Sequence, residues 1–329
     1  MSTASVSTPT YSIPSPREIT TKPRRSDVIF RSVVTLGGFT SLFILGLITF
    51  FLGYRGWHVL QESGLHFLTG AKWISADPDA GTKSNYGVGA MLAGTFVIAF
   101  IGLLVGAPLA IGVALFLTYY APEALKKPLS LVIDIMAAIP SIVYGLWGYF
   151  VLMPHAIYWA KLLHKYFSWI PVFEMRDPVF LRSPFVAGLV LSIMIIPIMT
   201  SVTREVFAQA PLDRIQAAYA LGATKWRMIK AVVFPYGRSG MIGGAMLGLG
   251  RAMGETVAVY TVLNISYQYN FQVLFSAGGS VASMIVAKFG EASAPEIDAL
   301  MAAGFVLFIA TLLVNLLADR IVNLGKKGR

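Results

Sequence analysis

The sequence predicts an all-α membrane protein, a polytopic bundle of about six transmembrane helices, and three observations lead to that prediction. Of the 329 residues, 56% are hydrophobic and only 13% are charged, and the mean hydropathy is +0.69. A soluble domain carries about 25% charged residues. Several apolar runs also reach the length of about 20 residues that a helix needs to cross roughly 30 Å of hydrocarbon. Finally, Lys and Arg gather in alternate connections.

Six such runs, taken in chain order, are predicted to cross the membrane. The first is too long for the core of a signal peptide and has no small-residue cleavage pattern, so we expect an uncleaved span. Pro and Gly inside the later runs are tolerated in helix bundles. The predicted spans are residues 32–54, 89–117, 128–153, 184–203, 239–263 and 299–318.

The segments around these spans complete the predicted organisation. The N-terminal segment is rich in Ser, Thr and Pro, which predicts a disordered cytoplasmic tail. The predicted divisions are the tail 1–26, the first transmembrane helix with a long periplasmic loop 27–87, a permease domain 88–319 and a basic cytoplasmic tail 320–329.

Two apolar stretches leave their relation to the membrane open. Residues 155–171 carry two lysines among aromatic residues, which favours an interfacial amphipathic helix over a span. Residues 271–287 are uncharged but short and contain three small residues in a row at 278–280, so they fit either a re-entrant or a periplasmic segment.

The distribution of positive charge predicts the orientation. The N-terminal segment up to Arg31, the 121–127 link, the 204–238 loop and the C-terminus carry 17 Lys and Arg, against 8 in the other three loops. The richer side is cytoplasmic by the positive-inside rule, so both termini are expected inside. The net charge of +10 by itself leaves a nucleic acid, a membrane surface and an anionic substrate open.

The composition limits the chemistry of the chain. It has no cysteine, and none of its four histidines falls in an HExxH pattern, so disulfides, thiol nucleophiles and Cys-ligated zinc are excluded. No GxxxxGK[ST] motif is present, so an ATPase must be a separate polypeptide. We therefore expect no catalytic residue, no metal site and no cofactor, and a membrane enzyme has no support in the residues.

The largest cytoplasmic segment, 204–238, is predicted to fold into an elbow of two helices. Pro211 can open the first helix, which Gly222 ends, and Thr224 can cap a second helix that Pro235 ends. An apolar face of residues 215, 218, 219 and 222 could dock into a groove on a soluble partner. An interfacial helix resting on lipid headgroups is the alternative.

Two charged residues lie inside the fifth predicted span. Arg251 and Glu255 are four residues apart, so they would share one face of a continuous helix near mid-depth. Such residues face the bundle interior or an aqueous path. They are either a buried ion pair that fixes helix register or an anion site, in which the arginine binds an oxyanion and the glutamate keeps binding weak. The nearby glycines are expected to serve packing.

The elbow resembles the EAA signature of ABC importer permeases. The run Gln216, Ala217, Ala218, followed by Gly222 and later by Pro235, has the spacing of that signature, with Gln216 in place of the usual Glu. The resemblance implies a type I ABC importer permease fold, MetI-like. It also implies that the elbow is the coupling helix that contacts an ATPase subunit.

Two further runs resemble the phosphate-specific branch of these permeases. They are residues 250–256, Gly-Arg-Ala-Met-Gly-Glu-Thr, and residues 139–148 in the third predicted span. The extra N-terminal span and long first loop resemble the PstC-type subunit. The resemblance implies phosphate translocation across the inner membrane, with Arg251 and Glu255 on the substrate path. It also implies four kinds of partner: a PstA-type permease, two PstB-type ATPase subunits, a PstS-type phosphate-binding protein and the lipid bilayer.

Some alternatives stay open on the residues alone. The substrate could be another oxyanion such as molybdate or sulfate. A stand-alone secondary anion transporter would be expected to show broken helices in both halves, and only one Gly-rich charged span is evident. Asp134 fits a solvated helix end or a part in gating, and Arg204 with Glu205 fits interface anchoring or a gate contact.

Overall fold

The computed structural model describes residues 24–75, 84–175 and 179–327, and these are mostly helical. The predicted N-terminal tail lies almost entirely outside the described residues, since helix α1 begins at Arg25. The chain forms two compact units, residues 1–48 and 49–329. The elements are α1 (Arg25–Ser63), α2 (Leu65–Thr69), β1 (Trp73–Ile74), β2 (Asn85–Tyr86), α3 (Gly89–Leu115), η1 (Phe116–Tyr120), α4 (Glu123–Ala138), α5 (Ser141–Trp147), η2 (Gly148–Leu152), α6 (Met153–Phe167), α7 (Pro184–Ala208), α8 (Leu212–Ala220), α9 (Lys225–Met228), η3 (Ile229–Val233), α10 (Phe234–Met253), α11 (Val257–Val262), α12 (Val281–Phe289) and α13 (Ala294–Lys327).

The first unit is the N-terminal part of α1. Its large hydrophobic side chains are exposed on all sides of the helix, and none of them is buried. Exposure of apolar groups around a whole helix is costly in water and favourable in lipid. The predicted first span, 32–54, lies wholly within this helix.

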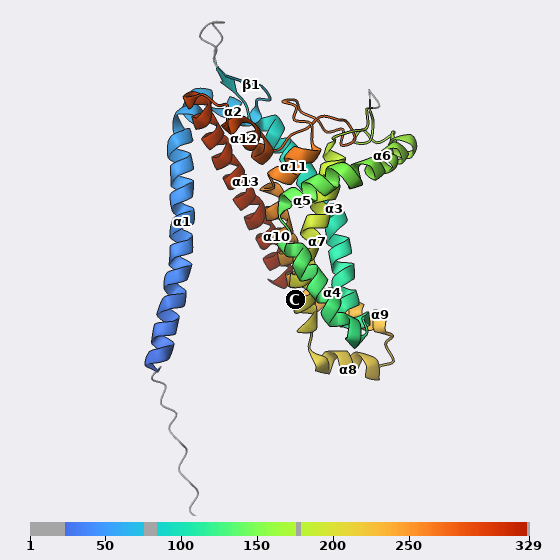
Figure 1. The fold of residues 1–329 in the computed structure, drawn as a ribbon. Helices are drawn as coiled ribbons and strands as arrows, with labels where there is room; N and C mark the ends of the chain where they lie inside the picture. Colours follow the sequence, from blue (N-terminus) through green and yellow to red (C-terminus); the bar gives the residue numbers. More distant parts are fainter. Residues whose placement is uncertain (1–23, 76–83, 176–178, 328–329) are drawn as a thin grey trace, which may run out of the picture. The chain divides into compact units, whose positions relative to one another are not determined.

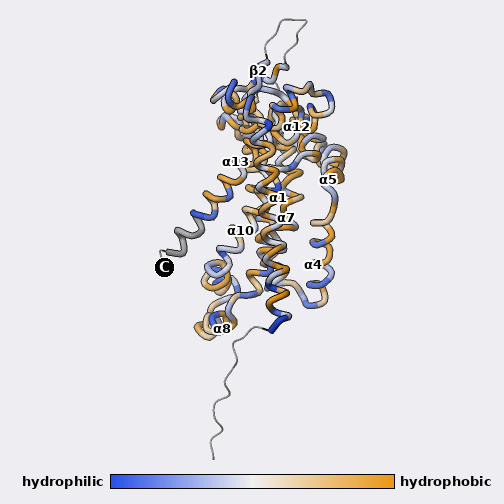
Figure 2. Tube along the Cα trace, turned by 90° about the vertical axis from the view of Figure 1, so that its left-hand side faces the viewer, coloured by the Kyte–Doolittle hydropathy of each residue, from blue (hydrophilic) through white to orange (hydrophobic). Residues whose placement is uncertain are grey.

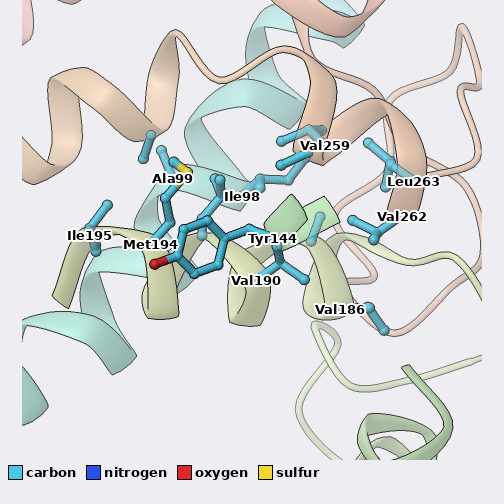
Figure 3. Close-up of a cluster of buried hydrophobic side chains, with 14 of the residues drawn as sticks. Ile98, Ala99, Tyr144, Val186, Val190, Met194, Ile195, Val259, Val262 and Leu263 are labelled. Atoms are coloured by element: carbon cyan, nitrogen blue, oxygen red, sulfur yellow. The ribbon is translucent and has the colours of Figure 1, made fainter. Parts of the chain in front are cut away.

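The second unit is a bundle whose centre is the pair α3 and α7 (Figure 1). Gly102 and Gly106 of α3 face Leu191 and Ile195 of α7, with no room for larger side chains. Small residues at such positions let membrane helices approach closely. Figure 3 shows the resulting core, in which the Tyr144 ring lies among Val190, Met194 and other apolar side chains.

Four described helices are long and apolar enough to cross a membrane by themselves, and a bent pair makes a fifth. They are α1, α3 with η1, α7, α13, and the pair α4 and α5–α6. Hydrophobic residues run along most of α13 in Figure 2, whereas hydrophobic and hydrophilic residues mix around α8. These helices match the predicted spans one, two, four, six and, in broken form, three.

The third predicted span is not one continuous helix. Helix α4 ends at Ala138, Ile139 and Pro140 are extended, and the chain continues from Ser141 at an angle of 95° to α4. A proline disfavours the helical conformation in the residue before it, which explains the break. The stretch 155–171 forms most of α6, which is continuous with α5 through η2 and carries an amphipathic pattern.

The fifth predicted span is interrupted as well. Helix α10 ends at Met253, and a new short helix, α11, begins at Val257. The prediction of one helix over 239–263 is therefore wrong. Helix α10, which begins at Phe234, is also not among the helices that are apolar enough to cross a membrane. The reason is that it contains two arginines and many glycines.

The pole of the bundle opposite α8 is made of short elements. The hairpin of β1 and β2 packs with α2, α12 and the start of α13 around Phe67, Val88 and Met284 (Figure 1). The Trp73 indole N–H donates to Oε1 of the buried Glu296 at 2.8 Å, which ties the hairpin to α13. Residues 271–287 form a loop and part of α12, which has nine residues and is too short to cross.

Candidate substrate path and coupling elbow

The first candidate site is the interruption between α10 and α11. Arg251 lies in the last turn of α10, where the free carbonyl groups of the helix end favour a positive charge. Glu255 lies beyond that end and is 8% exposed. Its Oε1 accepts a hydrogen bond from the Ala258 backbone N–H at 3.2 Å, which satisfies a free donor in the first turn of α11.

This arrangement corrects the expected pairing of the two charges. Because the helix ends at Gly254, Arg251 and Glu255 do not share a helix face, and among the described residues neither forms an ion pair. Each charge is stabilised by a different helix end. Arg251 is also in the last turn of its helix rather than near its middle.

The interruption is held in place by α5. An ideal Cβ atom on Gly145 would lie 2.9 Å from the Ala258 Cα atom and in contact with the Thr261 hydroxyl, so α5 and α11 touch at backbone distance. Tyr144 beside it donates from its hydroxyl to the Met136 carbonyl at 2.7 Å, across the break between α4 and α5. The structure thus places the run 139–148 against α11, the helix that directly follows the run 250–256.

The glycines of α10 divide into two faces, which partly confirms a packing role. Gly237, Gly240, Gly244 and Gly248 face side chains of α7, whereas an ideal Cβ on Gly243 would meet nothing within 4 Å. Asn315 of α13 lies beside Gly250 on this second side. Its buried Oδ1 has no hydrogen-bond partner within the described part of the chain. The sequence reasoning missed Asn315, although a polar residue inside a predicted span is the signal that could have found it.

The other sequence-predicted polar residues lie away from this interruption. Asp134 is exposed on α4 among exposed apolar side chains, and Arg204 and Glu205 lie near the end of α7 that leads into α8. The structure does not bring any of them into contact with Arg251 or Glu255 through a hydrogen bond or ion pair between described residues.

The second candidate site is the elbow of α8, α9 and η3, and its first bend is a glycine turn. Gly222 has φ +76°, a conformation that suits glycine. The Gly222 N–H donates to the Tyr219 carbonyl, and the Ala223 N–H donates to the Ala218 carbonyl. This is the hydrogen-bond pattern of a Schellman motif. It explains in physical terms why a glycine follows Ala218 at a spacing of four residues.

The second half of the elbow begins as predicted and ends differently. The Thr224 hydroxyl caps α9 by accepting from the Arg227 N–H at 3.4 Å. Pro235, however, does not end this helix, since η3 leads directly into α10 with Pro235 in its first turn. The wide π-helical turn before Pro235 accommodates the missing backbone donor, and the first turn of a helix tolerates proline.

Half of the predicted apolar face of the elbow packs within the chain, whereas Tyr219 and Gly222 are exposed. Ile215 and Ala218 lie against a buried cluster that includes Phe207, Met228 and Val233. The outer surface instead exposes Gln216 and Ala217, together with the large side chains Leu212 and Leu221, which are 72% and 89% exposed. Apolar side chains exposed to this degree at one end of a bundle mark a surface for a partner or for lipid.

Contacts behind this surface join the elbow to the membrane helices. Lys225 Nζ lies 4.6 Å from the centre of the Tyr120 ring, at the end of η1. The Tyr119 hydroxyl donates to the Phe207 carbonyl of α7 at 2.8 Å. Lys225 thus connects the elbow to η1, and η1 is connected in turn to α7.

Comparison with known proteins places this architecture in a family. Residues 106–327 match the model of the binding-protein-dependent transport system inner membrane component. The chain therefore belongs to this family, whose members are permeases of ABC importers, and it is a multi-pass inner-membrane protein. Its mostly helical fold with four to five apolar spans is that of type I importer permeases.

Several curated relatives extend over almost the whole chain. The chain is 40% identical over 303 residues to a protein of Mycobacterium tuberculosis named phosphate transport system permease protein PstC 2, covering 91% of this chain and 93% of the relative. It is 37% identical over 294 residues to the PstC protein of Pasteurella multocida, covering 88% and 89%.

A solved structure shares the fold. A chain of a bacterial alginate ABC transporter, in complex with its pentasaccharide-bound periplasmic protein, aligns with a TM-score of 0.53 at 16% identity. The alignment covers 91% of this chain and 97% of that chain.

Proposed function

We propose that this chain is the PstC-type permease subunit of an ATP-driven importer of inorganic phosphate. The observation that carries the proposal is the near full-length similarity to permeases that are named for phosphate transport. The chain itself makes no covalent bond and contributes a path through the membrane. The family description also argues against a stand-alone secondary transporter, although the fold contains two interrupted helices where the sequence predicted continuous spans.

Arg251 and Glu255 are the proposed substrate-path residues. An arginine stays protonated and presents several N–H donors to an oxyanion. Its position at the end of α10 fits this role, because an interrupted helix leaves polar backbone groups beside a path. The Glu255 carboxylate, held on α11, would repel an anion that lingers, so phosphate would not bind too tightly to leave.

The elbow is the proposed contact with the ATPase, through Gln216, Ala217 and Ala218 on α8, Gly222 at the bend and Pro235 at the start of α10. The proposed complex contains a second permease of the PstA type, two cytoplasmic PstB-type ATPase subunits that hydrolyse ATP, and a PstS-type phosphate-binding protein. Both termini and the elbow would then be cytoplasmic. The transporting domain is proposed to span residues 88–319, with the first helix and periplasmic loop before it.

The experiment that tests this function is uptake of labelled phosphate by vesicles that contain the purified complex. We expect uptake only when ATP and the binding protein are both present. Excess unlabelled phosphate should compete, whereas sulfate and molybdate should not. Competition by one of those anions alone would assign the importer to that oxyanion, and uptake without a binding protein would contradict the class.

A second experiment tests the elbow. Gly222→Pro cannot adopt φ +76°, so the bend should be lost and the ATPase should no longer co-purify with the membrane complex. The control is Gly290→Ala, at the end of α12 near the opposite pole, where φ is −72° and an added Cβ meets nothing. Retention of the ATPase at the normal ratio by Gly222→Pro would contradict the coupling assignment.

A further inference from the structure

A cavity of about 520 Å³ lies where the two short helices α5 and α11 approach each other. We call it the α5–α11 vestibule. Its polar lining consists of Tyr149 of η2, Arg182, and three residues at the end of α11 and just after it, Tyr260, Thr261 and Asn264. Four apolar side chains complete the lining. A volume of this size falls in the range of small-molecule sites, about 300–1,000 Å³.

The electrostatics of the vestibule favour an anion. Arg182 is the one charged residue among those that line it, and no carboxylate is in the lining. In the described part of the chain Arg182 forms no ion pair. A cation in a cleft that lacks a compensating negative charge raises the local concentration of anions.

The Arg182 side chain is also oriented. Its guanidinium carbon lies 4.8 Å from the centre of the Tyr149 ring, a cation–π distance. A guanidinium group over an aromatic face keeps its in-plane N–H donors available for an oxyanion. The ring therefore restricts the side chain without using the donors that would bind a ligand.

The backbone around Arg182 is fixed by the loop that follows α11. The Ser276 hydroxyl donates to the Arg182 carbonyl at 3.3 Å, and the Asn264 side-chain amide donates to the Ser276 carbonyl at 3.1 Å. Ser183, the next residue, caps α7. The vestibule cation is thus held between the start of α7 and the end of α11.

The vestibule lies one short helix from the proposed substrate path. Helix α11 has six residues, so its ends are about 9 Å apart. Glu255 contacts its first turn, and Tyr260 and Thr261 of its last turn line the vestibule. An anion in the vestibule would be close to the path but separated from Arg251 by α11.

We propose that the α5–α11 vestibule is an entry site for the transported oxyanion, in which Arg182 holds the anion weakly before it reaches Arg251. This inference rests on the proposed function, because it assigns an earlier binding step to the same transport path. A weak site is expected here, since Arg182 is exposed and a single exposed charge pair contributes little.

The test uses the absence of cysteine from the native chain. Arg182→Cys is introduced, and the purified complex is treated with a positively charged or a negatively charged methanethiosulfonate reagent before it is placed in vesicles. The matched control is Lys165→Cys on α6, which removes another cation placed over a ring, 5.3 Å from Tyr166, outside the vestibule. The complex with the native chain, treated in the same way, reports any effect on other subunits.

We expect Arg182→Cys to lower phosphate uptake per assembled complex by about tenfold at phosphate concentrations below KM, and little at saturation. The positive reagent should restore most of the loss and the negative reagent should deepen it. Raising the ionic strength should reduce the difference between native and variant complexes, because salt screens exposed charges. Lys165→Cys should change none of these rates.

Three results would overturn the proposal while the native complex still transports phosphate. They are unchanged uptake by Arg182→Cys, equal inhibition by both reagents, and loss of uptake that the positive reagent does not restore. If the native complex itself fails to take up phosphate, the proposed function fails instead, and the two failures are therefore distinguishable.

Discussion

The two interrupted helices of the bundle differ in what breaks them. Between α4 and α5 the chain turns at Ile139 and Pro140, both in extended conformations, and the local sequence is sufficient to explain the turn. Between α10 and α11 no proline is present. There the chain leaves the helix at Gly254, and the Glu255 side chain bonds the first turn of the next helix.

The difference teaches that one break is local and the other depends on the rest of the bundle. At the first break Pro140 disfavours the helical conformation of Ile139, although α3 and α7 continue through Pro108 and Pro197. The second break is stabilised by a buried carboxylate and by close packing of α11 on α5. Because tertiary contacts hold this break, the charged residues beside it can face a path without disrupting the hydrogen bonds of a continuous helix. This suits the break that carries Arg251 and Glu255.

The largest effect is expected at the second break, for Arg251→Ala. The substitution removes the one basic side chain of the interruption, so phosphate uptake should fall to background while the complex assembles normally. Arg251→Lys should retain part of the activity, because it keeps the charge but loses the planar set of donors. Uptake of labelled phosphate in vesicles measures both.

A matched control removes a cation elsewhere in the same bundle. Lys161→Ala on α6 should transport at the native rate. Native uptake by Arg251→Ala would show that the second break does not form the substrate path. The difference between the two breaks would then have no bearing on transport.

The next effect concerns the contact between the breaks. In Gly145→Ala the new Cβ would collide with α11, 2.9 Å from the Ala258 Cα atom, and should lower the free energy of unfolding by about 1–3 kcal/mol. Gly243→Ala on α10 is the control, since nothing lies within 4 Å of its Cβ. It should be neutral or stabilising by about 0.5–1 kcal/mol. The measurement is the melting temperature of each variant in detergent. Equal shifts of the melting temperature in both variants would contradict the packing of α5 on α11.

A smaller effect on stability is expected for Glu255, where two substitutions separate the hydrogen bond from the negative charge. Glu255→Ala removes the acceptor of the Ala258 N–H and should cost about 1 kcal/mol of stability. Glu255→Gln keeps an acceptor oxygen, so its thermal stability should stay close to that of the native chain. Equal losses of stability in the two variants would show that the hydrogen bond does not hold the second break.

The last effect lies in the loop after α11 and is absent at neutral pH, since it develops only in alkaline solution. Burial raises the pKa of Tyr267 from 10.0 to about 12, and the negative charge of Glu296 adds to the shift. Above pH 10 the unfolded chain loses this proton while the folded chain keeps it, so the stability from this group falls as the pH rises toward 12. Tyr267→Phe should show a shallower alkaline fall in melting temperature. Identical pH profiles would contradict this burial of the hydroxyl.

The sequence predicted the helix-bundle class, the positions of most spans and the parts of the elbow, because these depend on local properties. A run of about 20 apolar residues matches the thickness of the hydrocarbon core, so its length and composition alone predict a span. The turn at Gly222 and the cap at Thr224 are likewise confirmed, since each needs only a few neighbouring residues. The assignment of Arg251 and Glu255 to a substrate path, and of the elbow to an ATPase, stays a prediction.

The predictions that were wrong concern where helices begin, end and break. The fifth span is interrupted at Gly254, because Glu255 and the packing of α11 on α5 stabilise a break there. The docking of the elbow stays a prediction. Pro235 begins α10 instead of ending a helix, because a π-helical turn precedes it. Periodicity and turn residues report which conformations a segment favours, but they do not report which partner it meets.

By itself, the sequence determined that this chain forms membrane-spanning helices and that an elbow of two helices follows the fourth span. Only the tertiary structure decided that the two charges belong to different helices and that α5 and α11 meet. It also placed Arg182 beside Tyr149 in a cavity, although the two are far apart in sequence. The physical reason is that hydrophobicity selects lipid or water one segment at a time, whereas close packing of glycine-bearing helices selects neighbours across the whole chain.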